Sequence, residues 1–587
     1  MTWVTYIIYI LVPLLLAIPL GTYISKVMDG KENILTRFLA PLDKLSSRWF
    51  HLDEKMNWKK YALSVITFSL VSLLVLMLIL KFQNLLPGNP QHFSGLSWSL
   101  AFNTAVSFVT NTNWQSYSGE FALSNFSQVL GLTVQNFASP AVGIAVLYAL
   151  IRGLVGHKRM DLGNFWQDLV KSIMYVLLPI SIVVATLLIW TGVPQSTSGF
   201  ATATLSNKVA VSTDGKLILG AKVNSKTNKV TLDGKSVKNA KVVSKESLPI
   251  FPQASQVAIK QLGTNGGGVL GANSAHPYEN PTPFSNLIEF TAMVLIPMSL
   301  VFAFGKSIGK PREGWMIFSV MAALFAIGLV VTGFAESKGV HVPGVGTITM
   351  EGKESRFGAA ASAIWAVGTT ATSTGAINSM LDSFSPLGGL LPMMLMQSGE
   401  VVFGGVGSGM YGMLGFVILT VFIAGLMVGR TPEYLGKKIG PAEMRMAVLA
   451  CLATPFSILV GSGIIAVWPK LVNVLTNSGP HGFSEFLYAF SSAGGNNGSS
   501  FGGFNANTPI LNIALALVML VARFVPIIAV LVIGQRMGKQ SLTAESSGTL
   551  RTTNPTFAIL LIVVILIIGV LSFFPALSLG PIADFLE

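Results

Sequence analysis

Four short segments of this sequence consist of glycine, asparagine, threonine or serine in different combinations, the residue types that a cation-binding loop requires. Each follows a moderately apolar stretch: 110–113 follows 98–109, 263–268 follows 255–262, 372–375 follows 359–367, and 494–498 follows 484–492. Apolar stretches of about ten residues are too short to cross a bilayer and are typical of re-entrant segments. Glycine permits positive φ angles that turn backbone carbonyls inward. Such carbonyls, with added hydroxyls, can replace the water around a potassium ion without adding fixed charge.

We expect these four segments to surround one potassium site. A re-entrant helix directs its negative C-terminal end toward the cation, and irregular backbone at membrane depth is tolerated only where it is buried in protein or lines a cavity. One such cluster alone would indicate an ordinary turn, but four that each follow a re-entrant stretch favour a selectivity filter. The predicted potassium-binding residues are Thr110, Asn111, Thr112, Thr264, Asn265, Gly266, Ser373, Thr374, Gly375, Asn496, Asn497 and Gly498.

Three polar residues could belong to the ion pathway. Gln115 follows the first segment, and it could bond to filter groups or lie at an exposed rim. Glu400 lies just before an apolar run and Arg523 lies within another. Charges at membrane depth are costly and indicate function by default, so we expect Glu400 to attract the ion below the filter and Arg523 to limit its escape. The alternative is a structural pair, or contacts with the backbone, that fix the helix bundle.

The stretch 399–412 contains six glycines. Each glycine costs about 1 kcal/mol relative to alanine in a helix, so this stretch predicts a break or bend below the filter. We expect a gate at this break that includes Gly404, Gly405 and Gly407. Close helix packing through small residues is the alternative interpretation.

The elements that must position these residues are membrane-spanning helices. The chain has 587 residues, of which 51% are hydrophobic and 11% charged, whereas soluble proteins carry roughly 25% charged residues. A helix needs about 20 apolar residues to cross the hydrocarbon core. These numbers indicate an all-α membrane protein with ten transmembrane helices, at 3–24, 61–81, 126–152, 168–192, 286–307, 315–335, 402–428, 446–469, 510–535 and 556–578.

The net charge of +13 arises mainly in short loops between these spans, so we expect no nucleic-acid partner. Residues 26–60 carry eight Lys or Arg, whereas residues 82–125 carry none. Positively charged loops remain in the cytoplasm, which predicts that both termini lie outside. The lysine-rich stretch 195–250 would then be a small external insertion, with hairpins at Asp214-Gly215 and Asp233-Gly234.

The filter segments divide the chain into four similar units of span, re-entrant helix, filter and span. We expect unit 1 at 61–152, unit 2 at 168–307 with the insertion, unit 3 at 315–428 and unit 4 at 446–535, all around one pore. Residues 1–60 would hold the first span and a cytoplasmic loop. Residues 556–587 would hold the tenth span.

Four strings in the sequence closely resemble those of one family. They are VSFVTNTNWQ at 106–115, GTNGGG at 263–268, GEVVFGGVGSG at 399–409 and SSAGGNNG at 491–498. Together they are similar to the KdpA family, the potassium-binding subunits of Kdp-type potassium-transporting ATPases, over nearly the whole chain except the insertion. That family belongs to a superfamily of transporters built like a potassium channel folded into one chain. The four filters depart from the symmetric channel motif Thr-Val-Gly-Tyr-Gly, so equal roles are not expected.

The resemblance implies a complex in a bacterial plasma (inner) membrane that takes up external potassium with high affinity. Its partners would be a P-type ATPase catalytic subunit and small single-span accessory subunits, with membrane lipid around the chain. Potassium is the implied ligand, and no organic cofactor is expected.

The chain lacks the sequence patterns of an ATP-hydrolysing enzyme. It has no Asp-Lys-Thr-Gly phosphorylation motif, and Gly305-Lys306-Ser307 lacks the P-loop glycine at position 300. The G-x-G-x-x-G match at 407–412 follows no strand of a βαβ unit. Cys451 is the single cysteine, which excludes a cysteine-cluster metal site. We therefore expect a non-catalytic subunit. A stand-alone channel or symporter of the same superfamily, and a scaffold or enzyme with vestigial filters, are the alternatives.

Overall fold

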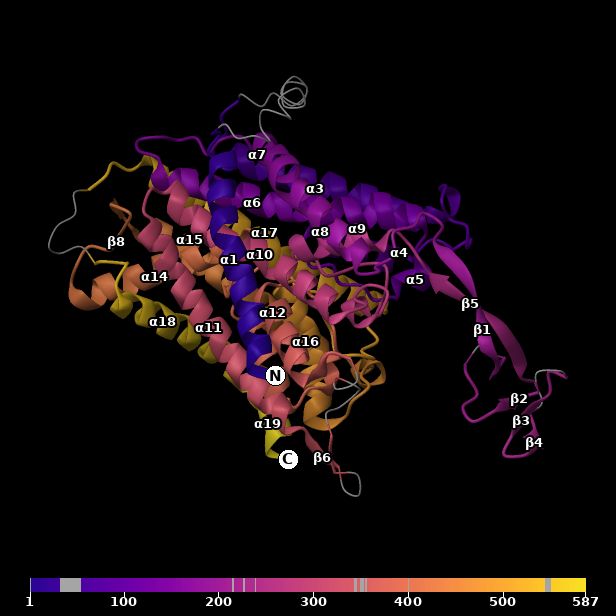
Figure 1. Ribbon diagram of the computed structural model, residues 1–587. Coiled ribbons are helices and arrows are strands. Elements are labelled where there is room, and N and C mark those ends of the chain that lie inside the picture. Colours follow the sequence, from indigo (N-terminus) through magenta and orange to yellow (C-terminus); the bar gives the residue numbers. More distant parts are fainter. Residues whose placement is uncertain are drawn as a thin grey trace. The chain divides into compact units, whose positions relative to one another are not determined.

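The computed structural model describes residues 2–31, 54–213, 216–224, 227–237, 239–342, 346–348, 353, 356–399, 401–543 and 550–587. These residues form two compact units (Figure 1). The larger unit, Met1–Val193 together with Ala254–Glu587, is helical and holds all four filter segments. The smaller unit, Pro194–Gln253, is built mainly from strands.

Ten helical segments of the described chain are long and apolar enough to cross a membrane, which confirms the predicted all-α membrane fold. They are Val4–Met28, Trp58–Lys81, Ser127–Val155, Phe165–Trp190, Pro283–Ser307, Pro311–Lys338, Ser408–Val428, Pro441–Ala466, Pro509–Lys539 and Pro555–Leu579. Their environments differ, because 89% of the most apolar window of the third and fifth is buried against 28% for the first, second and tenth. The third and fifth therefore lie at the centre of the bundle, and the other three present broad apolar faces to its outside.

The helices, in chain order, are α1 Thr2–Met28, α3 Trp58–Lys81, α4 Trp98–Val109, α5 Gly119–Ala122, α6 Val134–Val155, α7 Phe165–Lys171, α8 Leu178–Trp190, α9 Gln253–Leu262, α10 Pro283–Ser307, α11 Pro311–Lys338, α12 Gly358–Ala371, α13 Pro386–Gln397, α14 Ser408–Val428, α15 Pro441–Ala466, α16 Gly479–Gly494, α17 Pro509–Lys539, α18 Pro555–Leu579 and α19 Pro581–Leu586. Two π-helical turns, Ser127–Thr133 and Ser172–Leu177, precede α6 and α8. Short 3-10 turns lie at Gln83–Leu85, Asn273–Ala275, Leu381–Ser383 and Leu471–Val474.

Four short helices end at the filter segments: α4, α9, α12 and α16. They coincide with the four stretches predicted to be re-entrant. Ser97 caps the start of α4 by accepting a hydrogen bond from the Leu100 N–H at 3.3 Å. In each case the second residue after the helix, Asn111, Thr264, Ser373 or Asn496, has a positive φ, and a left-handed residue interrupts the helical hydrogen-bond pattern.

The predicted seventh span, 402–428, is wrong in its first turn, because α14 begins only at Ser408. Residues 401–407 are irregular, and Phe403, Gly404 and Gly407 all have positive φ angles. Left-handed residues end a right-handed helix. The expected break in the glycine-rich stretch is thus a non-helical segment between α13 and α14.

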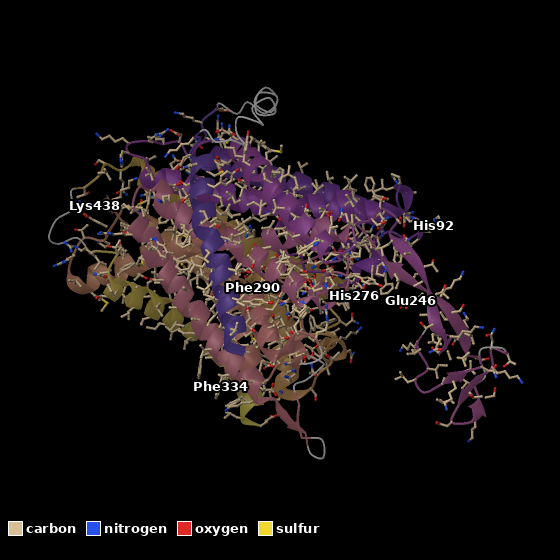
Figure 2. All side chains as sticks on the ribbon, in the orientation of Figure 1. His92, Glu246, His276, Phe290, Phe334 and Lys438 are labelled. Atoms are coloured by element: carbon tan, nitrogen blue, oxygen red, sulfur yellow. The ribbon has the colours of Figure 1, made fainter. Side chains whose placement is uncertain are left out.

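Both chain termini lie at the same end of the helical unit (Figure 1). Phe334, near the end of α11, lies toward that end, whereas Lys438 lies at the other (Figure 2). Lys438 belongs to the short hairpin of β8 Glu433–Tyr434 and β9 Lys437–Lys438. An even number of crossings brings both termini to one side, and the basic β8–β9 hairpin lies opposite them.

The small unit contains two antiparallel sheets. Strand β1, Phe200–Val211, pairs with β5, Lys241–Pro249, and the register shifts between Thr204 and Val209. Strands β2 Lys222–Val223, β3 Val230–Leu232 and β4 Lys235–Ser236 form the second sheet. Asp233 and Gly234, both with positive φ, join β3 to β4, as an Asp-Gly hairpin turn requires. The Asp214-Gly215 pair lies outside the described residues. A further two-stranded sheet, β6 Val340–Val342 with β7 Gly346–Ile348, belongs to the helical unit.

Candidate functional site: a ring of four loops

The four filter segments share one backbone pattern over four residues each. We call them loop 1 (110–113), loop 2 (263–266), loop 3 (372–375) and loop 4 (495–498). In every loop the second and fourth residues have positive φ: Asn111 and Asn113, Thr264 and Gly266, Ser373 and Gly375, Asn496 and Gly498. Five of these eight are not glycine, so the conformation is held against a steric preference. Residues that alternate between left- and right-handed conformations can present successive carbonyls to one side of the chain, as a carbonyl-lined filter needs.

Each loop is anchored to its own helix by the same hydrogen bond. The N–H of the third residue donates to the carbonyl five residues earlier. The four bonds are Thr112 to Ser107 (2.9 Å), Asn265 to Lys260 (2.7 Å), Thr374 to Thr369 (2.9 Å) and Asn497 to Ser492 (2.9 Å). This bond draws the loop back over the helix end, so the helix dipole and the loop face the same space.

Three glycines bring neighbouring loops into backbone contact. A Cβ built on Gly266 would lie 1.9 Å from the Thr374 carbonyl oxygen, one on Gly375 would lie 2.0 Å from that of Asn497, and one on Gly498 would lie 2.1 Å from that of Thr112. Loop 2 therefore touches loop 3, loop 3 touches loop 4, and loop 4 touches loop 1. The loops thus follow one another around a ring in chain order. None of these three junctions has room for a residue larger than glycine.

The junction between loops 1 and 2 is different, because asparagine side chains form it. The Asn111 amide donates to the Thr264 carbonyl at 2.8 Å, and the Asn265 amide donates to Asn111 Oδ1 at 2.7 Å. The amide of Asn113, at the position of the three ring glycines, donates to Asn136 on α6 at 2.7 Å. Ser139, also on α6, donates to Asn111 Oδ1 at 2.8 Å. Side-chain hydrogen bonds thus join loops 1 and 2 themselves, and the close backbone approach involves Gly267, just beyond loop 2, where an added Cβ would lie 2.7 Å from the Asn113 carbonyl oxygen.

The ring lies at the base of a cavity of about 420 Å³. Its lining includes the fourth residue of every loop, Asn113, Gly266, Gly375 and Gly498, together with Gln115. The part of the chain that follows each filter supplies most of the remaining wall, including Tyr117, Asn273, Met380 and Phe501. The four loops therefore line one and the same cavity.

Gln115 binds the segment that directly follows loop 2. Its Nε2 donates to the Gly268 carbonyl at 3.1 Å and its Oε1 accepts from the Gly268 N–H at 2.9 Å. This two-point contact joins the segment after loop 1 to the segment after loop 2 on the cavity side. It thus adds a second link between the chain segments that form the asparagine junction.

The irregular segment 401–407 contacts the ring. The Val406 N–H donates to Thr264 Oγ1 at 3.1 Å, and the Gly404 N–H donates to the Ala371 carbonyl at 2.9 Å. Gly407 packs against α6 so closely that its missing Cβ would lie 2.1 Å from the Gly143 oxygen. The Gly405 carbonyl accepts the Gly409 N–H at 3.0 Å in the first turn of α14.

Arg523 is buried on α17 near the same place. Its Nη2 lies 3.5 Å from the position that a Cβ on Gly143 would occupy. Gly143 in turn contacts the Val406 carbonyl. The structure thus brings Arg523 close to the predicted gate segment, while Glu400 lies outside the described residues.

Sequence reasoning missed the residues that hold the ring from behind. Ser107, Thr369 and Ser492 anchor loops 1, 3 and 4, and Lys260 anchors loop 2. The sequence signal that could have identified one of them is Lys260 itself, because a lysine inside a re-entrant apolar stretch is rare and indicates a special role. Asn113 lies in the first filter segment but is not among the predicted binding residues.

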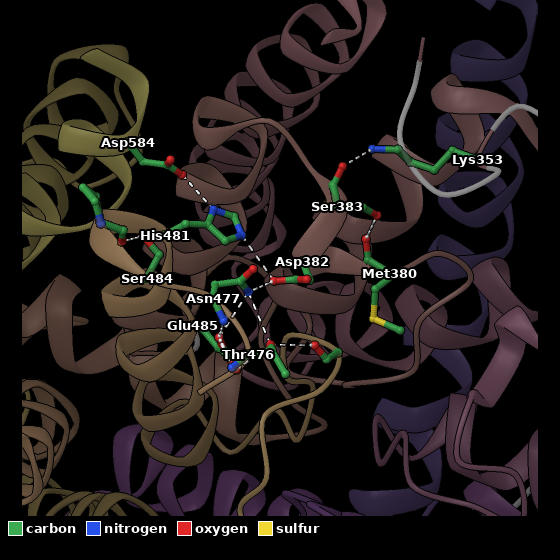
Figure 3. A network of polar contacts seen from close by, with 12 residues as sticks. Lys353, Met380, Asp382, Ser383, Thr476, Asn477, His481, Ser484, Glu485 and Asp584 are labelled. Carbon is green, nitrogen blue, oxygen red and sulfur yellow. Dashed lines mark hydrogen bonds and ion pairs between the residues drawn. The ribbon is translucent and has the colours of Figure 1, made fainter. Parts of the chain in front are cut away.

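A polar network joins the segment that follows loop 3 to the start of α16 (Figure 3). His481, in the first turn of α16, contacts Asp382 at 3.2 Å and Asp584 of α19 at 2.8 Å. Asn477 also donates to Asp382, at 2.8 Å. The hydrogen bond with Asp382, helped by the one with Asp584 and opposed by burial, raises the pKa of His481 to about 9. The segment after loop 3 is thereby joined to the start of the loop 4 helix.

The ten apolar helices define a multi-pass membrane protein. The structure is similar to that of the potassium transporter TrkH from Vibrio parahaemolyticus, with a TM-score of 0.51 over 88% of this chain and 96% of that one, at 16% sequence identity. This likeness concerns the fold alone.

The sequence model of one family, described as "KdpA: Potassium-transporting ATPase A subunit", matches residues 7–586, and the chain belongs to this family. Relatives named "Potassium-transporting ATPase potassium-binding subunit" include one from Clostridium botulinum (strain Alaska E43 / Type E3), 53% identical over 99% of this chain and 98% of its own. Another, from Listeria monocytogenes serotype 4a (strain HCC23), is 50% identical over the same shares of the two chains.

Proposed function

We propose that this chain binds external potassium in the ring of loops 1–4 and passes it on within an ATP-driven uptake complex. The shared backbone pattern of the four loops supports this proposal, because alternating left- and right-handed residues can present carbonyl oxygens to one side of a chain, and the fourth residue of every loop lines one cavity. The loops contain no Asp or Glu, so binding relies on dipoles that let the ion leave again. The proposed ligands are the first three residues of loop 1, Thr110, Asn111 and Thr112, and the second, third and fourth residues of loops 2, 3 and 4.

The family indicates a subunit of a potassium-transporting ATPase that does not itself hydrolyse ATP. We infer that a P-type catalytic subunit carries the hydrolysis and that small single-span subunits and lipid complete the complex. The membrane would be the bacterial plasma (inner) membrane with both termini outside. The basic β8–β9 hairpin at the opposite end supports this orientation, since positive loops stay in the cytoplasm.

The segment 401–407 would act as the gate. Its hydrogen bonds to Thr264 and Ala371 place it against loops 2 and 3, where it can block straight passage. A pump subunit needs such a block, because an open pore would dissipate the gradient. Arg523 would limit escape toward the cytoplasm, and we keep Glu400 as the proposed attracting group on this route.

The filter is tested by Gly266→Asp and Gly375→Asp. Each adds a Cβ that would overlap the neighbouring carbonyl oxygen and a charge at the ring. Uptake of potassium by whole cells should lose affinity or its preference over sodium. Unchanged uptake and selectivity in both variants would remove the basis of the proposal.

The pump role is tested by purification and by labelled ATP. A pump subunit should co-purify with an ATPase chain, and the isolated chain should incorporate no phosphate. A chain that purifies alone and conducts potassium in vesicles would instead be a stand-alone channel. Phosphate incorporation into the isolated chain would refute the non-catalytic role.

The gate is tested by replacing Gly404, Gly405 and Gly407 with alanine and measuring passive potassium flux without ATP. A leak, or ATP hydrolysis uncoupled from uptake, is expected because the segment could no longer pack under the ring. Coupled transport without a leak in the folded variant would favour close packing as the role of these glycines. Gly463→Ala in α15 is a suitable control, since a Cβ there meets nothing within 4 Å.

A further inference from the structure

Lys260 is a fully buried lysine in the helix that carries loop 2. Its backbone carbonyl accepts the N–H groups of Asn265 at 2.7 Å and Gly266 at 3.3 Å. Its ammonium forms an ion pair with Glu279, whose side chain is also buried, and donates to Asn273 Oδ1 at 3.2 Å. One residue therefore holds loop 2 by its backbone and the cavity wall by its side chain.

The ammonium lies directly behind the wall of the cavity. A Cβ built on Gly268 would lie 3.2 Å from Lys260 Nζ, and Asn273 lines the cavity. Glu279 also accepts the Leu270 N–H at 3.3 Å through its other oxygen. The ion pair thus lies beside Gly268 and bonds Leu270, and Gln115 also binds Gly268.

The other three loops have a hydroxyl residue where loop 2 has Lys260. The Thr369 hydroxyl accepts the Gly375 N–H and the Ser492 hydroxyl accepts the Gly498 N–H, each at 2.9 Å. The Ser107 hydroxyl donates to the Trp114 carbonyl at 3.0 Å. A neutral hydroxyl is therefore sufficient to hold such a loop, so the lysine adds a charge that anchoring alone does not require.

A positive charge behind a cation site repels the cation unless a carboxylate balances it. Glu279 supplies that balance. A second buried carboxylate, Glu289, lies in the same region, but its Oε2 accepts hydrogen bonds from Gln261 at 3.0 Å and Ser274 at 2.6 Å. Glu279 is therefore the partner that directly neutralises the ammonium.

We propose that Lys260 and Glu279 are a positioning ion pair for loop 2 whose charge balance sets the affinity of the ring for potassium. This inference rests on the proposed function, because it assumes that potassium binds at the ring. The pair touches no ion itself and acts through Asn265, Gly266 and Gly268. Breaking a buried pair leaves one uncompensated charge, and the sign of that charge depends on which partner is removed.

The test compares Glu279→Gln, Lys260→Met and the double variant in the assembled complex. Glu279→Gln leaves the ammonium and should raise the KM for potassium by roughly three- to tenfold, whereas Lys260→Met leaves the carboxylate and should change KM in the opposite direction. The double variant should return close to the wild-type KM. The maximal rate per assembled complex should stay unchanged in all three.

A purely structural role predicts another outcome, namely the same direction of change in both single variants with no recovery in the double. That result, or an unchanged KM in every variant, would overturn the inference. Lys260→Arg keeps the charge and should keep the wild-type KM. If the KM of Lys260→Arg changes like that of Lys260→Met, the inference is also overturned. Lys260→Arg can still be measured if the complex with Lys260→Met does not assemble.

The Arg152–Asp168 pair provides a matched control, because Asp168 is equally buried. Arg152 lies sixteen residues beyond Asn136 on α6, roughly 24 Å from the ring side of that helix at 1.5 Å per residue. Asp168→Asn should lower the yield of complex but leave KM unchanged. If Gly375→Asp impairs uptake and the pair variants do not alter KM, the proposed function stands and this inference fails. If neither affects uptake, the proposed function itself fails.

Discussion

The ring closes in two ways, and the contrast shows how one chain can break a fourfold arrangement. At three junctions a glycine lets the backbone of one loop rest against a carbonyl of the next, with room for no side chain. At the junction of loops 1 and 2, Asn111, Asn113 and Asn265 fill the corresponding space with amide groups. The glycine junctions rest mainly on backbone contact, with one amide hydrogen bond from Asn496 to Thr112 Oγ1 at 2.9 Å between loops 4 and 1. The amide junction depends on a connected set of hydrogen bonds.

The two halves of the ring are also held in place by different hydrogen bonds. Loops 3 and 4 use a hydroxyl from their own helix to hold the fourth residue, and the His481 network joins them at the side. Loops 1 and 2 depend on α6, through Asn136 and Ser139, and on Gln115. We therefore expect substitutions in the two halves of the ring to fail in different ways.

The largest effect is expected from Gly375→Ala at a glycine junction. The new methyl group would lie 2.0 Å from the Asn497 carbonyl oxygen, and the residue has a φ of 88° that alanine adopts poorly. Overpacking and backbone strain together cost about 2–4 kcal/mol. Potassium uptake in cells that lack other uptake systems should be abolished.

Gly358→Ala is the matched control. Gly358 has a similar φ of 83°, but nothing lies within 4 Å of the Cβ that would be added. Uptake should be reduced only slightly. Equal loss in both variants would show that backbone strain matters and contact between loops does not, which would remove the distinction drawn for this junction.

An intermediate effect is expected from Asn111→Ala at the amide junction. The substitution leaves the Thr264 carbonyl, the Asn265 amide and the Ser139 hydroxyl without this partner, and a buried polar group left unsatisfied costs about 1–3 kcal/mol. The KM for potassium should rise about tenfold. Selectivity against sodium should be retained, because the three glycine junctions remain.

Asn111→Ser is the informative comparison, since its hydroxyl can satisfy part of the set. It should lie between wild type and Asn111→Ala in KM. A normal KM for Asn111→Ala would indicate that the fourth junction needs no side-chain hydrogen bonds.

A smaller effect is expected from Asn113→Gly, which makes the fourth junction resemble the other three. The variant loses the 2.7 Å hydrogen bond with Asn136 and removes the side chain that fills the space. A net hydrogen-bond contribution of about 0.5–1.5 kcal/mol predicts a change in KM of threefold to tenfold at most. Complete loss of uptake would mean that the asymmetry at this position is required for transport.

The sequence allows the ten spans, the four re-entrant helices and the four loops to be predicted, because each is encoded locally by apolar length and glycine clusters. The order of contacts around the ring is different, since Gly498 meets Thr112 only after the chain has folded back on itself. The partner of Lys260 could not be read from spacing either, because Glu279 follows after an irregular loop. The start of α14 at Ser408 depends on positive φ angles that an apolar count does not detect.

The smallest effect is expected for the dependence of stability on pH, which arises from His481 beside loops 3 and 4. His481 is held by Asp382, which follows loop 3, and by Asp584 of α19, and its pKa is raised to about 9 from an ordinary value of 6.5. Because the folded state binds the proton more tightly, the stabilisation is complete below pH 6.5, declines above it and is lost as the pH rises through about 9.

The unfolding temperature of the complex in detergent should therefore fall between pH 7 and pH 10, and His481→Gln should be less stable than wild type at pH 7 by about 1–2 °C. At pH 10 the two should unfold together, since the imidazole is then neutral in both states. The Gln115→Ala variant, on the other half of the ring, should keep the wild-type dependence on pH. A His481→Gln variant whose deficit persists at pH 10 would indicate that packing against Phe501, and not the charge, is what His481 contributes.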